Sequence, residues 1–154
     1  TIGAGDRAVL KRLVHTLEVL FSAIGLLTGL TIFLLRRPLL TVFGGTLTEN
    51  ACRLSMQFMA VIAVTTVGTS YQVACDNGII RGGGDTAFSA KMNLISMWLI
   101  IVPLSALAAF RWELAPVVVF FLLKWDQLYK IIPVAIRLHS WKWVKVVTRN
   151  DNEV

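Results

Sequence analysis

A row of polar residues lies inside one long apolar stretch of the chain. Thr65, Thr69, Gln72 and Asp76 follow one another at i, i+4, i+7 and i+11. This spacing places all four on one face of a helix. If that helix lies in lipid, its polar face must contact protein or a water-filled cavity. The row therefore predicts either a cavity-lining site or a set of hydrogen bonds between helices, since Thr and Gln also bond neighbouring backbone.

Two charged residues, Lys124 and Asp126, interrupt another apolar stretch. A charge near the bilayer centre costs ~2.5–3.5 kcal/mol on insertion scales, so it usually has a partner or a function. Asp126 and Lys130 are one helical turn apart and can form an ion pair. Lys124 can reach Gln127 or a carboxylate on another helix. We expect structural pairing first and a conformational switch or substrate path second.

A glycine-rich segment, Gly78–Thr86, joins two of the apolar stretches. Its glycines allow a sharp turn, and Asp85 can cap the helix that follows by accepting hydrogen bonds from free N–H groups. Local capping is the first interpretation of this loop. A cytoplasmic hinge or gate latch is the second. The candidate residues for either role are Arg81, Gly82, Gly83, Gly84 and Asp85.

Long uncharged stretches dominate the elements that carry these residues. The chain has 154 residues, of which 56% are hydrophobic, and its mean hydropathy is +0.70. About 20 apolar residues span a bilayer as a helix, whereas the alternating strands of a membrane barrel are missing from the pattern. We therefore predict an all-α polytopic membrane protein with four transmembrane helices over residues 13–35, 54–77, 92–110 and 114–137.

The basic residues are unevenly distributed between the two ends of such a bundle. Ten Lys and Arg residues fall on the side of both termini and the glycine segment, and four fall on the opposite side. The positive-inside rule then places both termini and the basic tail, 138–154, in the cytoplasm of a plasma-membrane protein. Trp141 and Trp143 in this tail are expected to anchor it at the membrane interface. Topology and anionic lipid account for the net charge of +6 without nucleic acid.

The sequence does not favour an enzyme. Within the predicted helices we find no His/Asp/Glu cluster at metal-binding spacing, and no Ser/His/Asp or Cys/His set at a shared depth. We therefore expect no metal, no cofactor and no catalytic residue. The chain starts at Thr1, inside what we interpret as a loop, and we expect it to be a fragment of a longer protein.

Several motifs resemble those of the multidrug and toxic compound extrusion (MATE) family. They are Ile2-Gly-Ala-Gly-Asp6 before the first span, the segment Gly78-Ile-Ile-Arg-Gly-Gly-Gly-Asp-Thr86, and the closing Lys124-Trp-Asp-Gln127, Trp141-Lys-Trp-Val144 and Thr148-Arg149. The glycine-Asp-Thr segment is fairly specific for that family. The likeness covers nearly the whole chain, which would correspond to the last four of twelve helices.

The resemblance implies a function. Members of this family have two lobes around a central cavity and export cationic or amphipathic drugs in exchange for protons or sodium by alternating access. It places the second helix beside the substrate cavity, which makes Thr65, Thr69, Gln72 and Asp76 substrate candidates. The lipid bilayer and the missing N-terminal part of the same transporter would be its partners. Some members carry a coupling carboxylate in this helix, and Asp76, near its cytoplasmic end, is the only candidate.

Two alternatives stay open. A lipid-linked precursor flippase of related architecture would need a strongly cationic cavity, and only Lys124 lies deep in a predicted span. A membrane scaffold or assembly subunit would have apolar packing faces without a polar row.

Overall fold

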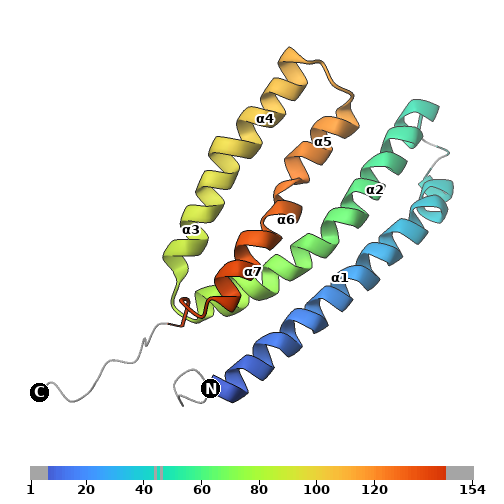
Figure 1. Ribbon diagram of the computed structural model, residues 1–154. Coiled ribbons are helices and arrows are strands. Elements are labelled where there is room, and N and C mark those ends of the chain that lie inside the picture. The colour runs from blue at the N-terminus through green and yellow to red at the C-terminus, as the bar shows by residue number, and fades with distance from the viewer. Residues whose placement is uncertain (1–6, 44, 46, 145–154) are drawn as a thin grey trace, which may run out of the picture.

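The computed structural model describes residues 7–43, 45 and 47–144, and in this part of the chain it is built from helices alone. Four helical rods lie side by side (Figure 1). The first rod is α1, Arg7–Phe43. The second is α2, Glu49–Gln72, continued by the π-helical segment η2, Val73–Ile80.

The third and fourth rods are more broken. The third contains α3, Thr86–Ile95, η3, Ser96–Ile101, α4, Val102–Ala106, and η4, Leu107–Arg111. The π-helical η3 ends next to Pro103, which has no N–H for the normal helical bond, and Val102 bonds back to Met97 across a wider turn. The fourth contains α5, Pro116–Lys124, α6, Asp126–Tyr129, and α7, Ile131–His139.

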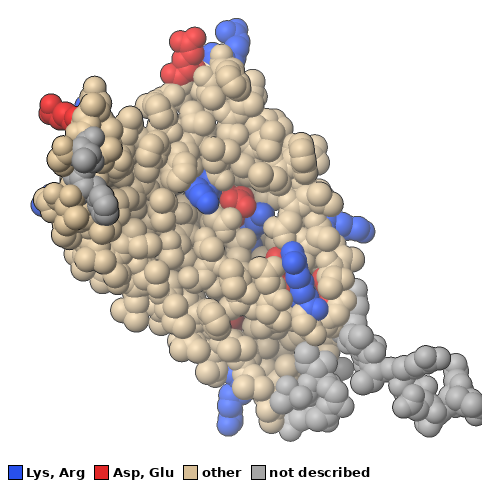
Figure 2. All heavy atoms as spheres, turned by 180° about the vertical axis from the view of Figure 1, so that it is seen from behind, with Lys and Arg blue, Asp and Glu red and all other residues tan. Residues whose placement is uncertain are grey.

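The apolar surface of this bundle fits a membrane. Three of the described helical stretches are long and apolar enough to cross a bilayer: Ala8–Val42, Glu49–Ile80 and Thr86–Arg111. Large side chains such as Leu27 and Phe110 are 66% and 86% exposed, which suits lipid rather than water. Figure 2 shows this as a largely uncharged face, with charged atoms at its ends and a small group of both signs part-way along it. The fourth predicted span corresponds to the broken rod α5–α7, and its crossing of the membrane stays a prediction.

The rods are ordered as the predicted topology requires. The start of α1, the connection from η2 to α3 and the end of α7 lie at one end of the bundle (Figure 1). The α1–α2 connection and the connection from η4 to α5 lie at the other end. The largest group of buried apolar side chains lies where α1, η2 and α7 meet, and includes Val14, Cys75, Ile80, Val134 and Leu138.

Glycine allows two of the rods to approach closely. A Cβ atom on Gly29 of α1 would come within 2.5 Å of the backbone oxygen of Ala63 in α2, and one on Gly25 would come within 2.9 Å of the Ser70 Cβ. Small residues at such contacts are typical of membrane helices, which associate through close packing rather than through hydrophobic burial.

Candidate functional site: a buried polar network between three rods

Asp76 is a buried member of a polar network that joins the second, third and fourth rods. It lies on η2 and is 3% exposed. One of its carboxylate oxygens accepts a hydrogen bond from the Ser89 hydroxyl, and the other accepts one from Nδ2 of Asn93 at 3.3 Å. Both donors come from α3. The carboxylate is thus held by neutral donors in a site that contains little solvent.

Asn93 links Asp76 to the fourth rod. Its side-chain oxygen accepts a hydrogen bond from Nζ of Lys130 at 2.9 Å, and the same ammonium group binds Oδ2 of Asp126 at 2.9 Å. Lys130 is only 4% exposed. The predicted Asp126–Lys130 pair is therefore confirmed, but Lys130 faces the bundle interior instead of belonging to the surface charge of one membrane side.

Two members of the predicted polar row bind the fourth rod directly. Nε2 of Gln72 donates to the backbone oxygen of Gln127 at 2.8 Å and lies 3.3 Å from that of Asp126. The Thr69 hydroxyl lies 3.2 Å from Oε1 of Gln127. Gly68 allows this approach, since a Cβ atom there would overlap the Gln127 carbonyl oxygen. These two residues therefore make hydrogen bonds between helices, the second of the two alternatives for the row.

The other predicted residues have different environments. The Thr65 hydroxyl is buried and bonds the Val61 carbonyl of its own helix at 3.0 Å. Lys124 is exposed. Of its two possible partners, Gln127 is not contacted, because the side-chain oxygen of Gln127 that could accept from Lys124 lies 3.2 Å from the Thr69 hydroxyl instead.

The sequence reasoning missed the α3 side of the network. Ser89, Asn93 and Ser96 are spaced i, i+4 and i+7, the same helical signal that identified the row on α2. Ser96 also bonds the Tyr129 hydroxyl of α6. A second polar row facing the first was therefore visible in the sequence, although its partners were not.

The glycine loop forms a second cluster at the end of the bundle. Asp85 occupies the N-cap position of α3, yet its side chain makes no capping hydrogen bond. Its carboxylate accepts a hydrogen bond from Nε of Arg137 in α7 at 2.8 Å. The prediction that this side chain caps α3 is therefore wrong. The buried carboxylate binds a cation on another rod instead.

Trp143 covers this loop from the segment after α7. It is fully buried, and its Nε1 donates to the Leu138 carbonyl at 2.8 Å. A Cβ atom on Gly83 would overlap its ring. The expected interfacial anchor is therefore wrong for Trp143, which packs against protein. Of the other loop candidates, Arg81 and Gly82 are exposed, and Gly84 has the positive φ of 94° that favours glycine.

Apolar rods that bury charged and amide groups between them define a polytopic α-helical membrane protein. The model of the MatE family matches residues 1–107, which include the first two rods and the third rod as far as Leu107, the first residue of η4. The chain belongs to the MatE family, whose members are membrane transporters. No curated protein and no solved structure matches it.

Proposed function

We propose that the chain forms part of a secondary active transporter that exports cationic or amphipathic compounds by proton or sodium antiport with alternating access. In this proposal it works at the plasma membrane, with its two ends and the glycine loop in the cytoplasm and with further helices of the same transporter as partners. Membership of the MatE family supports the general activity. The observation that carries the mechanism is the buried network from Asp76 to Lys130 and Asp126.

The charges of this network suit coupling to a cation. The network contains two carboxylates, Asp76 and Asp126, and one ammonium group, Lys130, which binds Asp126 directly and is linked to Asp76 only through the Asn93 amide. The ionised network therefore has one net negative charge. An unbalanced charge in a site of low polarity is costly. A proton or a monovalent cation on Asp76 would neutralise the network, and its departure would restore the charge. Binding of the coupling ion can thereby change how strongly the three rods are held together.

In this proposal, the contact between the polar row of α2 and the fourth rod opens and closes during transport. Thr69 and Gln72 bind the fourth rod, and Asp76 binds the third. Separation of the fourth rod from α2 would expose the row to a cavity, where its hydroxyl, amide and carboxylate oxygens could accept a cationic compound. The same contacts disfavour a passive scaffold, which has no need for a charged network within its packing faces.

Export of a fluorescent cationic dye from vesicles tests this function. The full-length transporter is reconstituted, and a pH gradient and a sodium gradient are imposed separately. At least one gradient should drive dye movement, and Asp76→Asn should abolish the dependence on that gradient. If neither gradient moves dye through the unaltered protein, the proposal is wrong.

Two threonines on α2 provide a matched comparison for the row. Thr69→Val removes the contact with Gln127, whereas Thr66→Val removes a hydroxyl that bonds only the Ile62 carbonyl of its own helix. We expect Thr69→Val and Gln72→Leu to reduce dye export at unchanged protein level, and Thr66→Val to leave export unchanged. Equal export by all three variants would mean that the row only holds helices together.

A further inference from the structure

Glu18 of α1 is a second largely buried carboxylate, outside the network of Asp76. Its side chain is 12% exposed. Oε1 accepts a hydrogen bond at 2.8 Å from the Tyr71 hydroxyl of α2. Oε2 lies 3.6 Å from Nε2 of His139, the last residue of α7. One carboxylate of the first rod therefore contacts both the second and the fourth rod.

The other nitrogen of the His139 ring determines what this contact requires. Nδ1 lies 2.9 Å from the backbone oxygen of Ala135. A carbonyl oxygen can only accept, so Nδ1 carries a hydrogen, and Nε2 of a neutral ring is then an acceptor. It would face a carboxylate oxygen of Glu18, which is also an acceptor. The contact is attractive only when one proton is bound, either on Nε2, which gives an ion pair, or on the carboxyl group, which then donates toward Nε2.

Charged groups on the neighbouring rods do not replace this proton. The second rod offers Tyr71 and Cys75, side chains that ordinarily carry no charge at neutral pH. On α7, Arg137 binds the Asp85 carboxylate instead. An ionised carboxylate with little solvent around it is costly without a cation. Among the residues that the structure describes, only His139 forms an ion pair with Glu18.

The titratable groups of α1 itself are directed elsewhere. His15 lies one turn before Glu18 and borders the same hollow on the helix surface, but it is exposed and forms no ion pair with a described residue. Nζ of Lys11 lies 5.7 Å from the centre of the Trp141 ring. His15 is therefore a control of the same residue type on the same helix.

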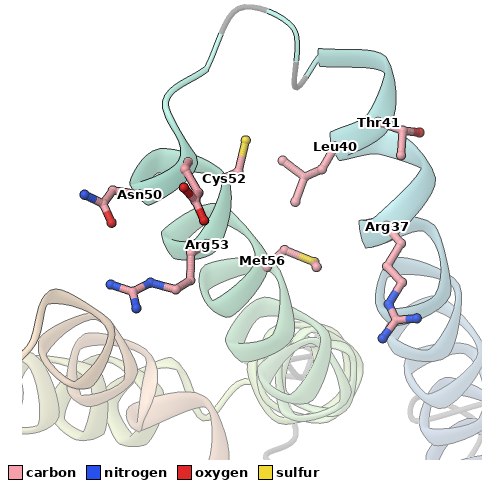
Figure 3. A pocket seen from close by; sticks show the side chains of 8 residues that line it. Arg37, Leu40, Thr41, Asn50, Cys52, Arg53 and Met56 are labelled. Carbon is pink, nitrogen blue, oxygen red and sulfur yellow. The ribbon is translucent and has the colours of Figure 1, made fainter.

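The opposite ends of α1 and α2 show no comparable contact. Figure 3 shows the hollow between them, where the Arg53 side chain is directed away from α1 and Met56 lies between it and Arg37. No ion pair connects the two helices there within the described part of the chain. The charged contact of α1 with another rod thus lies toward its first end, at Glu18.

The His139 side chain is 63% exposed, so its ring can exchange protons with water at the end of the bundle where α1 begins (Figure 1). We propose that Glu18 and His139 together bind one proton from the aqueous phase at this end, and that this proton fastens α1 to α7. Imidazole groups change charge between about pH 5 and 8, so the fastening is present near pH 6 and lost near pH 8. This proton is separate from the coupling ion at Asp76, and its binding does not depend on transport.

Thermal unfolding of the purified full-length protein in detergent, at pH 6 and at pH 8, tests the proposal. Because the attraction needs the proton, its contribution to stability is present at the lower pH and lost as the pH rises. Glu18→Gln and His139→Gln should each lower the unfolding temperature by about 2 °C at pH 6, as for one partly exposed ion pair, and by less at pH 8. The double variant should lose less than the sum of the two. His15→Gln should show no such difference between the two pH values.

Hydrogen exchange locates the effect in the structure. At pH 6, the amides of α7 and of the first half of α1 should exchange faster in His139→Gln than in the unaltered protein. At pH 8 the two proteins should exchange alike. This comparison is made between proteins at the same pH, so the pH dependence of exchange itself cancels.

Three results would overturn the proposal. Equal destabilisation by His139→Gln at both pH values would show a packing role without a proton. Unchanged unfolding and exchange of His139→Gln at pH 6 would show that the pair does not hold the rods. A pH-dependent loss in His15→Gln equal to that in His139→Gln would place the proton on His15. If Glu18→Gln does not fold, His139→Gln still decides the question, because this side chain is largely exposed.

Discussion

Nε of Arg137 donates a hydrogen bond to the Asp85 carboxylate at 2.8 Å, across 52 residues of sequence. The carboxylate is buried, with 3% of its side chain exposed, whereas 26% of the arginine side chain is exposed. The pair therefore fastens the glycine loop, which connects the second and third rods, to the last helix of the fourth rod.

Removal of one partner of this pair should destabilise the protein more than removal of both. Arg137→Gln leaves the Asp85 charge buried and is expected to cost about 3 kcal/mol, at the lower end for a broken buried pair, because the arginine is partly exposed. Asp85→Asn with Arg137→Gln should cost less than the sum of the single changes. Thermal unfolding in detergent measures the stability of the unaltered protein, the two single variants and the double variant. Additive effects would show that the two side chains do not interact.

Adjacent glycines in the loop should differ sharply in their tolerance of alanine. Gly83→Ala places a methyl group into the Trp143 ring, whereas Gly82 has open space within 4 Å. Overpacking of a buried contact costs ~1–3 kcal/mol, so Gly83→Ala should lower the unfolding temperature by several degrees. Gly82→Ala should leave it nearly unchanged. Similar unfolding temperatures for the two variants would argue against the Trp143 contact.

Gly68 is expected to be essential for the contact between α2 and the fourth rod. A Cβ atom at this position would overlap the Gln127 carbonyl oxygen, and displacement of that backbone would also break the Gln72 hydrogen bond. Gly68→Ala should therefore reduce both the amount of folded protein and dye export. Gly78→Ala is the control, because its methyl group would lie 3.6 Å from the nearest atom, the Val73 carbonyl oxygen. A folded, fully active Gly68→Ala protein would refute this packing.

The two lysines of the fourth rod should separate stability from function. Lys130→Met leaves the Asp126 carboxylate without its cation and should cost ~3–5 kcal/mol, as for other broken buried pairs. Lys124 is exposed, so Lys124→Met should harm export more than folding. For both variants, quantitative immunoblotting measures the amount of inserted protein, and the dye assay measures export. Loss of inserted protein in Lys124→Met would instead assign that lysine a structural role.

Local patterns predicted the rods and part of the network. Uncharged stretches located the helices because charge is costly in lipid, and the i, i+4 spacing alone identified the pair of Asp126 and Lys130. The row on α2 was found in the same way. Each of these features depends on neighbours in sequence, which is why helical periodicity could show it.

Contacts between different rods could not be predicted from such local patterns. Lys130 and Arg137 are two of the ten basic residues that the sequence pattern places on one side of the membrane, because nothing near them in the sequence indicates that Asn93 and Asp85 lie opposite them. Trp143 alternates with lysines like an interfacial residue. Its burial depends on the missing side chain of Gly83, 60 residues earlier. Such pairings follow from the angles and offsets at which the rods pack.

The broken fourth rod has a consequence for how the protein is made. Its three charges, Lys124, Asp126 and Lys130, make it a poor candidate to enter lipid alone, since each costs ~2.5–3.5 kcal/mol at mid-membrane. The groups that receive it, among them Gln72 and Asn93, belong to segments the ribosome has already released. As a predicted fourth span, it is therefore expected to insert against the preceding helices, so that the order of synthesis would also be the order of assembly.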